Sequence, residues 1–209
     1  MYRLTAIGID VLAEAVIIIP LFLLLFRRRL LLQRNWAGRG LYVIFAFYLT
    51  AVCSATGMPD IYHPMFQWSV NWVPLVDAVH SPVNYMENSM LNVALFVPAG
   101  FLAPLLWEEF RLFSKTVVFG AAMSFAVEIL QIFTLRLTDV DDLLMNTLGC
   151  MAGYGLARLV TGGFSHGIHT GYGDSRQEIL VLTAGVYGVW AVLHPYLASC
   201  LWEWVLSAS

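Results

Sequence analysis

Residues 116–135 read TVVFGAAMSFAVEILQIFTL, twenty residues that hold a single charged side chain, Glu128. A membrane-spanning helix needs roughly 17–25 predominantly apolar residues, and this run has that length. Its apolar residues are continuous rather than alternating, which favours a helix over a strand of a membrane barrel. The stretch therefore predicts a transmembrane helix with one carboxylate inside it.

Five further apolar runs predict spanning helices of the same kind. They cover residues 4–26, 41–58, 90–107, 143–160 and 179–201. The 209-residue chain is 59% hydrophobic and 12% charged, whereas a soluble domain has roughly 45–50% and about 25%. This composition, with a net charge of -3, excludes a soluble enzyme, a disordered chain and a basic nucleic-acid-binding protein. We expect an all-α, polytopic membrane helix bundle of about six transmembrane helices, with residues 1–209 forming a single integral membrane domain.

The basic residues predict which side of the membrane each loop faces. Nine of the eleven Lys and Arg residues fall between the first and second, third and fourth, or fifth and sixth predicted helices. Only Arg3 and Arg136 fall on the other side. Because positively charged loops remain in the cytoplasm, we expect both termini outside, together with the turn that joins the fourth and fifth helices.

Polar side chains gather in the predicted outer halves of three helices. They are Asn88 and Asn92 at the start of the third helix, Glu128 and Gln131 in the fourth, and Asp141, Asp142 and Asn146 at the start of the fifth. The pairs spaced by three or four positions share one face of their helix. The outer turn adds Arg136 and Asp139. All of these groups can therefore converge on one cavity that opens to the outer face.

Ionisable groups at membrane depth are costly and are functional by default. We interpret three of them as candidate catalytic residues: Glu128, Arg136 and Asp142. The candidate substrate-binding residues are Asn88, Asn92, Gln131, Asp139, Asp141 and Asn146. The alternative is structural, because amides cross-link membrane helices for about 0.6 kcal/mol on average, and Arg136 can simply neutralise a carboxylate.

Two sets of acidic residues allow more than one interpretation. Asp139, Asp141 and Asp142 carry the oxygen ligands that Mg²⁺ or Ca²⁺ prefer, but the full calcium-loop pattern is absent. The sequence therefore predicts no metal site, and it leaves any cofactor unknown. Asp10 and Glu14, four residues apart, either join the outer cavity or lie protonated at a helix contact.

Three motifs in the middle of the chain resemble the VanZ-like family of bacterial membrane proteins. They read NSMLNVALFVPAGF at 88–101, EILQ at 128–131 and RLTDVDDLLMNTLGCMAGY at 136–154, with a looser match, NWVPL, at 71–75. Trp72, Val76 and Ala99 depart from the residues usual in the family, and all three are apolar. The resemblance, which covers residues 71–154, implies a multi-pass protein of the bacterial plasma membrane associated with low-level teicoplanin resistance. It implies no established reaction.

Two functions are consistent with these candidate site residues. In the first, the outer site binds or modifies an envelope lipid or lipid-linked substrate, with Glu128 as a general acid or base and Arg136 holding a phosphate or carboxylate. In the second, the protein is a transporter or an ion-coupled binding module that uses Glu128 as a proton or cation site. The expected partners are the lipid bilayer and a lipid-linked cell-wall intermediate or lipoglycopeptide, and no nucleic acid is expected.

Overall fold

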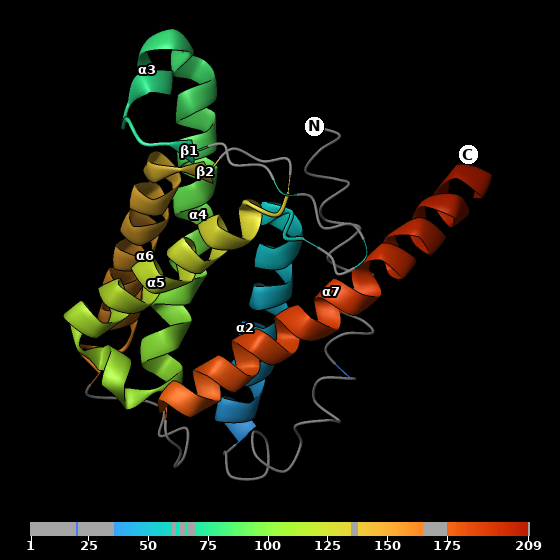
Figure 1. Cartoon of the computed structure of the whole chain (residues 1–209). Coiled ribbons are helices and arrows are strands. Elements are labelled where there is room, and N and C mark those ends of the chain that lie inside the picture. Colours follow the sequence, from blue (N-terminus) through green and yellow to red (C-terminus); the bar gives the residue numbers. More distant parts are fainter. Residues whose placement is uncertain are drawn as a thin grey trace. The chain divides into compact units, whose positions relative to one another are not determined.

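The structure is a computed structural model that describes residues 20, 36–59, 62, 66, 70–134, 138–164 and 175–208 (Figure 1). These residues are almost entirely helical, which confirms the prediction of an all-α membrane-type helix bundle. Apart from residue 20, the first predicted helix, 4–26, lies outside the described residues. The placement of both termini outside the cell remains a prediction.

The described helices are α2 (Trp36–Thr56), α3 (Val76–His80), α4 (Pro82–Leu106), the 3₁₀ helix η1 (Glu108–Arg111), α5 (Phe113–Gln131), α6 (Val140–Val160) and α7 (Ser175–Ala208). All except α3 and η1 match the remaining five predicted runs. Two short strands, β1 (Val70–Asn71) and β2 (Thr138–Asp139), pair in parallel. Among the described residues, α2, α4, α5, α6 and α7 each contain a segment long and apolar enough to cross a membrane.

Helix α4 is longer than its apolar run because it begins at Pro82 rather than at residue 90. Proline suits the first turn of a helix, where the backbone N–H has no partner within the helix. The additional turns carry Asn84, Glu87 and Asn88, which lower the local hydropathy without breaking the helix. An apolar run therefore marks only the part of this helix that can lie in hydrocarbon.

The described residues form two compact units. We call residues 65–170, with both strands and α3 to α6, the central unit, and the part that contains α2 and α7 the terminal unit. The expectation of a single domain over residues 1–209 remains a prediction.

The terminal unit is held together by aromatic residues of α7. Trp190 is buried, and its indole Nε1–H donates to Ser54 Oγ of α2 at 3.3 Å. The Trp190 ring stacks on His194, with ring centroids 4.4 Å apart. The Tyr187 hydroxyl donates to the Pro59 carbonyl oxygen at 3.1 Å, just beyond the end of α2. These contacts give the large ring of Trp190 both burial and a hydrogen-bond partner.

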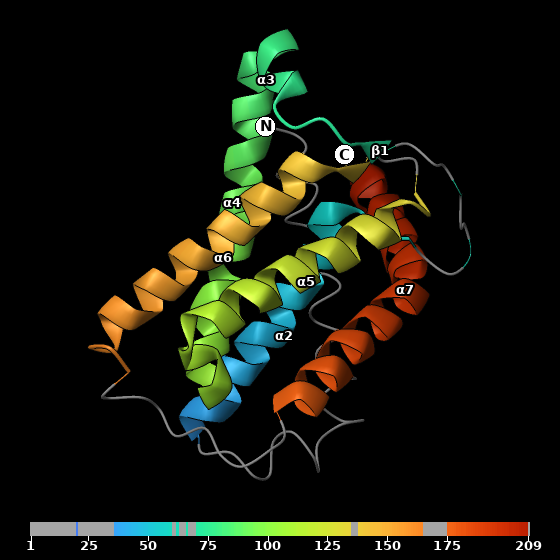
Figure 2. The same ribbon diagram turned by 60° about the vertical axis from the view of Figure 1, so that its left-hand side comes forward.

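Glycine residues allow α4 and α6 of the central unit to cross at close range, and the crossing can be followed in Figure 2. A Cβ atom at Gly149 would meet the Val93 carbonyl oxygen, and one at Gly153 would meet the Val97 carbonyl oxygen. Both glycines lie four residues apart on α6 and face α4, so they form the small-residue stripe through which membrane helices approach one another. The Gly149–Gly153 stripe is itself apparent from the sequence.

Helix α5 packs against the same crossing through Cys150. A Cβ atom at Gly120 would lie 2.6 Å from Cys150 Sγ, so the absence of a side chain at Gly120 makes room for the thiol. Cys150 Sγ donates to the Thr116 carbonyl oxygen at 3.4 Å. On α4, a Cβ atom at Gly100 would meet the Cys150 carbonyl oxygen. A single residue of α6 thus contacts both neighbouring helices.

Candidate functional site

The candidate site lies at the end of the central unit where α5 ends and α6 begins. The first residues of α6 are positioned by Asp139, which is the N-cap residue and accepts a hydrogen bond from the Asp141 N–H at 2.9 Å. Such a cap satisfies a backbone donor that the first turn of a helix leaves without a partner. β2 is paired with β1 in a register that places Asn71 opposite Asp139. This end of α6 is therefore fixed both by its own cap and by a second segment.

Two carboxylates at this end are buried. Glu128 is 5% exposed, and its Oε2 accepts a hydrogen bond from the Asp139 N–H at 3.2 Å. Asp141 is 4% exposed, and its Oδ2 accepts from the Leu75 N–H at 2.8 Å. Backbone donors thus stabilise both carboxylates, as buried acidic groups require. Glu128 also lies within electrostatic range of Asp142 and Asp139.

Amide side chains complete the site on two levels. Asn92 of α4 donates from Nδ2 to Asp142 Oδ1 at 2.5 Å. Deeper in the unit, Asn146 Nδ2 donates to Ser124 Oγ at 2.9 Å, and both residues are buried. Ser124 and Glu128 lie four residues apart on α5, as Asp142 and Asn146 do on α6, so the two helices face each other with matched polar stripes. We call Asn92, Glu128, Asp139, Asp141 and Asp142 the acidic cluster.

The acidic cluster contains five of the nine residues that the sequence singles out. Asn146 lies one helical turn deeper, and Gln131 is buried in the last turn of α5. Asn88 is exposed one turn before Asn92 on α4, and the structure describes no contact between it and the carboxylates. Arg136, the cation proposed to join Glu128 and Asp142, lies outside the described residues. The catalytic and binding roles of all nine residues remain predictions.

Asn71 belongs to the site, although it is not among the nine residues predicted from the sequence. Its Nδ2 donates to Asp139 Oδ2 at 3.2 Å, and its Oδ1 accepts from the Val73 N–H at 3.2 Å. The signal is the NWVPL stretch, where an asparagine just before a turn is typical of a side chain that caps its own backbone. What the sequence does not reveal is its partner, which lies 68 residues further along the chain.

The helices are closely packed below the site. Below Asn146, the Cys150 side chain fills the space left by Gly120, and the Thr116 hydroxyl donates to the Phe110 carbonyl oxygen at 2.5 Å. At the far end of α6, Tyr154 donates to the Arg111 carbonyl oxygen at 2.7 Å. Close contact between helices at Cys150 therefore separates the acidic cluster from the opposite end of the unit.

The charge at the described end is strongly negative. The Lys and Arg residues that the structure describes in the central unit are Arg111, Lys115 and Arg158, and they lie away from the acidic cluster, in η1, at the start of α5 and at the end of α6. Within the described residues, no group of three His, Cys, Asp or Glu side chains is arranged to hold a metal ion. The acidic cluster can thus accept protons, accept hydrogen bonds and attract cationic groups.

The fold and the site define a polytopic α-helical membrane protein, with five described helices able to span a bilayer and a carboxylate–amide cluster where α5 ends and α6 begins, joined by Asn92 of α4. The chain belongs to the VanZ/LLP1 family, whose family model matches residues 40–161, more than half of the sequence. This match confirms the resemblance seen in the sequence motifs and extends it to α2. No curated protein and no solved structure matches the chain significantly.

Proposed function

We propose that this protein lies in the bacterial plasma membrane as a multi-pass protein whose acidic cluster opens to the outer face. There it binds or modifies an envelope lipid or a lipid-linked cell-wall substrate, and in this way it gives low-level resistance to teicoplanin and related lipoglycopeptides. The observation that carries the proposal is the gathering of four carboxylates, with Asn92 of α4, where α5 ends and α6 begins. Carboxylates so close to hydrocarbon are costly and are kept for function by default.

The negative charge of the cluster restricts how a ligand is held. Carboxylates attract an ammonium group and repel a phosphate. A phosphate-bearing lipid would therefore need Arg136, the one basic residue between α5 and α6, as its anchor. Glu128, which is buried and adjacent to other carboxylates, is the group suited to exchange a proton with a bound substrate.

Three asparagines of α4 support the entry of a ligand from the end of the central unit that carries the acidic cluster. Asn84, Asn88 and Asn92 are spaced by four residues and so share one helix face. Asn84 and Asn88 are exposed, and Asn92 contacts Asp142. This stripe offers amide donors and acceptors along a path that leads to the carboxylates.

A second candidate function, an ion-coupled transporter that uses Glu128, is favoured by the polar residues of the α5–α6 interface. Ser124, Asn146 and Thr116 continue from Glu128 toward the opposite end. The tight contact between Gly120 and Cys150 interrupts this series of polar side chains, however. A site that serves one face of the membrane is therefore the better-supported function.

Binding to the purified protein in lipid nanodiscs tests the proposal. We expect saturable binding of teicoplanin or of a polyprenyl-pyrophosphate-linked cell-wall precursor, and weaker binding of that probe to Glu128→Gln. Vancomycin, which lacks the acyl tail, serves as the comparison for teicoplanin. If the wild-type protein binds neither teicoplanin nor the precursor, the proposed ligand class is wrong.

Sidedness is tested by cysteine labelling in intact cells. In a Cys200→Ser background, we expect Glu87→Cys to react with a membrane-impermeant thiol reagent added outside, and Glu108→Cys to react only after the cells are opened. Both positions are exposed, and they lie at opposite ends of α4, within α4 and just beyond it in η1. The reverse pattern would place the acidic cluster at the cytoplasmic face and contradict the proposed site of action.

A further inference from the structure

We propose that the segment before and at the start of α4 is embedded in the lipid headgroup region and holds the acidic cluster at a fixed depth in the membrane. This segment, residues 70–90, is called the tip segment; it contains β1, α3 and the first turns of α4. The partner that covers its exposed apolar surface is the lipid bilayer itself. The inference concerns the membrane contact of the chain and does not rest on the proposed ligand.

The tip segment exposes large apolar side chains. Trp72 is 70% exposed, Val79 80% and Val83 76%. The other exposed members are Val73, Leu75, Met86 and Met90. So many contiguous apolar side chains in water would be unfavourable, and such a patch marks a contact with a membrane or with another molecule.

Helix lengths place this patch at headgroup level. α5 and α6 have 19 and 21 residues, which at 1.5 Å per residue correspond to about 28 and 31 Å, the thickness of a bilayer's hydrocarbon core. α4 has 25 residues, or about 37 Å. Asn92 lies level with Asp142 at the start of α6, so the first turns of α4 extend about 15 Å further. The whole of α4 exceeds the hydrocarbon core by about 7 Å, which fits one headgroup layer, because the two layers together bring the full bilayer to roughly 40–45 Å.

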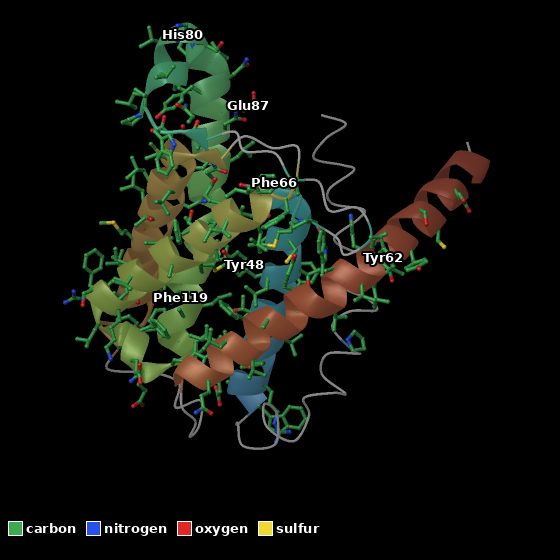
Figure 3. The ribbon with its side chains drawn as sticks, in the orientation of Figure 1. Tyr48, Tyr62, Phe66, His80, Glu87 and Phe119 are labelled. Carbon is green, nitrogen blue, oxygen red and sulfur yellow. The ribbon has the colours of Figure 1, made fainter. Side chains whose placement is uncertain are left out.

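The figures show the same arrangement. α3 lies beside the N-terminal end of α4 in both ribbon views, beyond the strand pair that marks the start of α6 (Figures 1 and 2). Figure 3 places His80 at this extremity and Glu87 on the adjoining turn of α4. The tip segment therefore projects past the acidic cluster along the direction of α4.

The apolar face of the tip is continuous with the surface that α4 presents to lipid. Val83, Met86 and Met90 are spaced by three and four residues on one face, whereas Asn84 and Asn88 share another. Ala94, one turn after Met90, is also exposed. An amphipathic helix end with a nearby tryptophan is the arrangement favoured at the boundary of a bilayer. A lipid that covers Met90 therefore also reaches Val83.

The tip segment is fastened to the acidic cluster at two points. Asn71 donates to Asp139 within the β1–β2 pair, and the Leu75 N–H donates to Asp141. Leu75 has a φ of 64°, in the left-handed region that non-glycine residues rarely adopt. The chain accepts this uncommon conformation at the residue whose N–H reaches the buried carboxylate. Anchoring of the tip in the headgroups thus fixes the depth of Asp139 and Asp141.

Spin labels measure this placement directly. In the full chain with Cys200→Ser, reconstituted in vesicles of phosphatidylethanolamine and phosphatidylglycerol, nitroxides are attached at Val79→Cys and Val83→Cys. We expect the ratio of collisions with oxygen to collisions with a water-soluble nickel chelate to lie between those of the lipid-facing control Leu148→Cys and of an aqueous position, as the headgroup region requires. Glu108→Cys, exposed at the opposite end, is the aqueous control, and its label should collide readily with nickel.

Each other outcome overturns the inference. Nickel accessibility at Val79 and Val83 equal to that at Glu108 would place the tip in water. Immobile labels shielded from both oxygen and nickel would mean that protein, not lipid, covers the tip. Because all four positions are exposed in the folded chain, the substitutions leave the core contacts in place.

Discussion

Replacing Glu128 by Gln, or Asp142 by Asn, is expected to abolish teicoplanin tolerance in a susceptible host while the amount of protein in the membrane stays unchanged. Each amide keeps the size of the carboxylate and an oxygen that can accept a hydrogen bond. In Glu128→Gln the new side chain can still accept from the Asp139 N–H, and in Asp142→Asn it can still accept from Asn92. The substitutions therefore remove charge and proton exchange but keep the contacts between helices.

The matched control is Glu108→Gln, which makes the same chemical change on an exposed side chain. Glu108 is 71% exposed and pairs with Arg111 at 3.6 Å, and such surface pairs contribute about 0–1 kcal/mol. This variant should retain full teicoplanin tolerance. Tolerance to vancomycin, which lacks the acyl tail, is measured in parallel to test whether the tail matters. Unchanged teicoplanin tolerance in both Glu128→Gln and Asp142→Asn would show that the carboxylates only hold the helices together.

The double substitution Gly149→Ala with Gly153→Ala is expected to destabilise the central unit severely. At each position the new methyl group would meet a backbone carbonyl oxygen of α4, that of Val93 or of Val97. Backbone atoms cannot rotate away as a side chain can, so α4 and α6 must move apart. Overpacking of a well-packed contact costs about 1–3 kcal/mol at one position. We expect a lower melting temperature and less monodisperse protein, measured by size-exclusion chromatography after heating in detergent.

Gly155→Ala is the matched control on the same helix. A Cβ atom there has no neighbour within 4 Å. Alanine has a higher helix propensity than glycine by roughly 1 kcal/mol, so this variant should be as stable as the wild type or more stable. Equal stability of the Gly155 variant and the Gly149–Gly153 variant would contradict a close crossing of α4 and α6.

The positions of the spanning helices follow closely from the sequence because the requirement is local. A run such as 116–135 must satisfy its backbone within one segment in hydrocarbon, and only a helix does so. The apolar runs of the sequence do not predict the start of α4 in the same way. Residues 82–89 are amphipathic, so an apolar run that begins at residue 90 misses them, although Ser81 and Pro82 are typical of a helix start.

The contacts of the site likewise fall into two groups, those that local spacing predicts and those that it does not. Spacing alone places Asp142 and Asn146 on one face of α6, and the short connection from α5 brings Glu128 close to them. The contacts from Asn71 to Asp139 and from Leu75 to Asp141 join residues 68 and 66 positions apart. No local rule of spacing determines which residues of a long connection return to a helix end. Such pairings depend on the packing of the whole unit.

Cys150 has a consequence for the thermodynamics of binding. Its carbonyl oxygen lies against Gly100 of α4 and its thiol against Gly120 of α5, so one residue sets the spacing of three helices at once. Close-packed interiors of this kind resist sliding, because no neighbour can shift without displacing another. Asn92, Glu128 and Asp142 are carried by these three helices and keep their positions before any ligand arrives. A ligand that enters the acidic cluster therefore loses its own freedom of motion but imposes little further ordering on the protein, which favours affinity from few contacts.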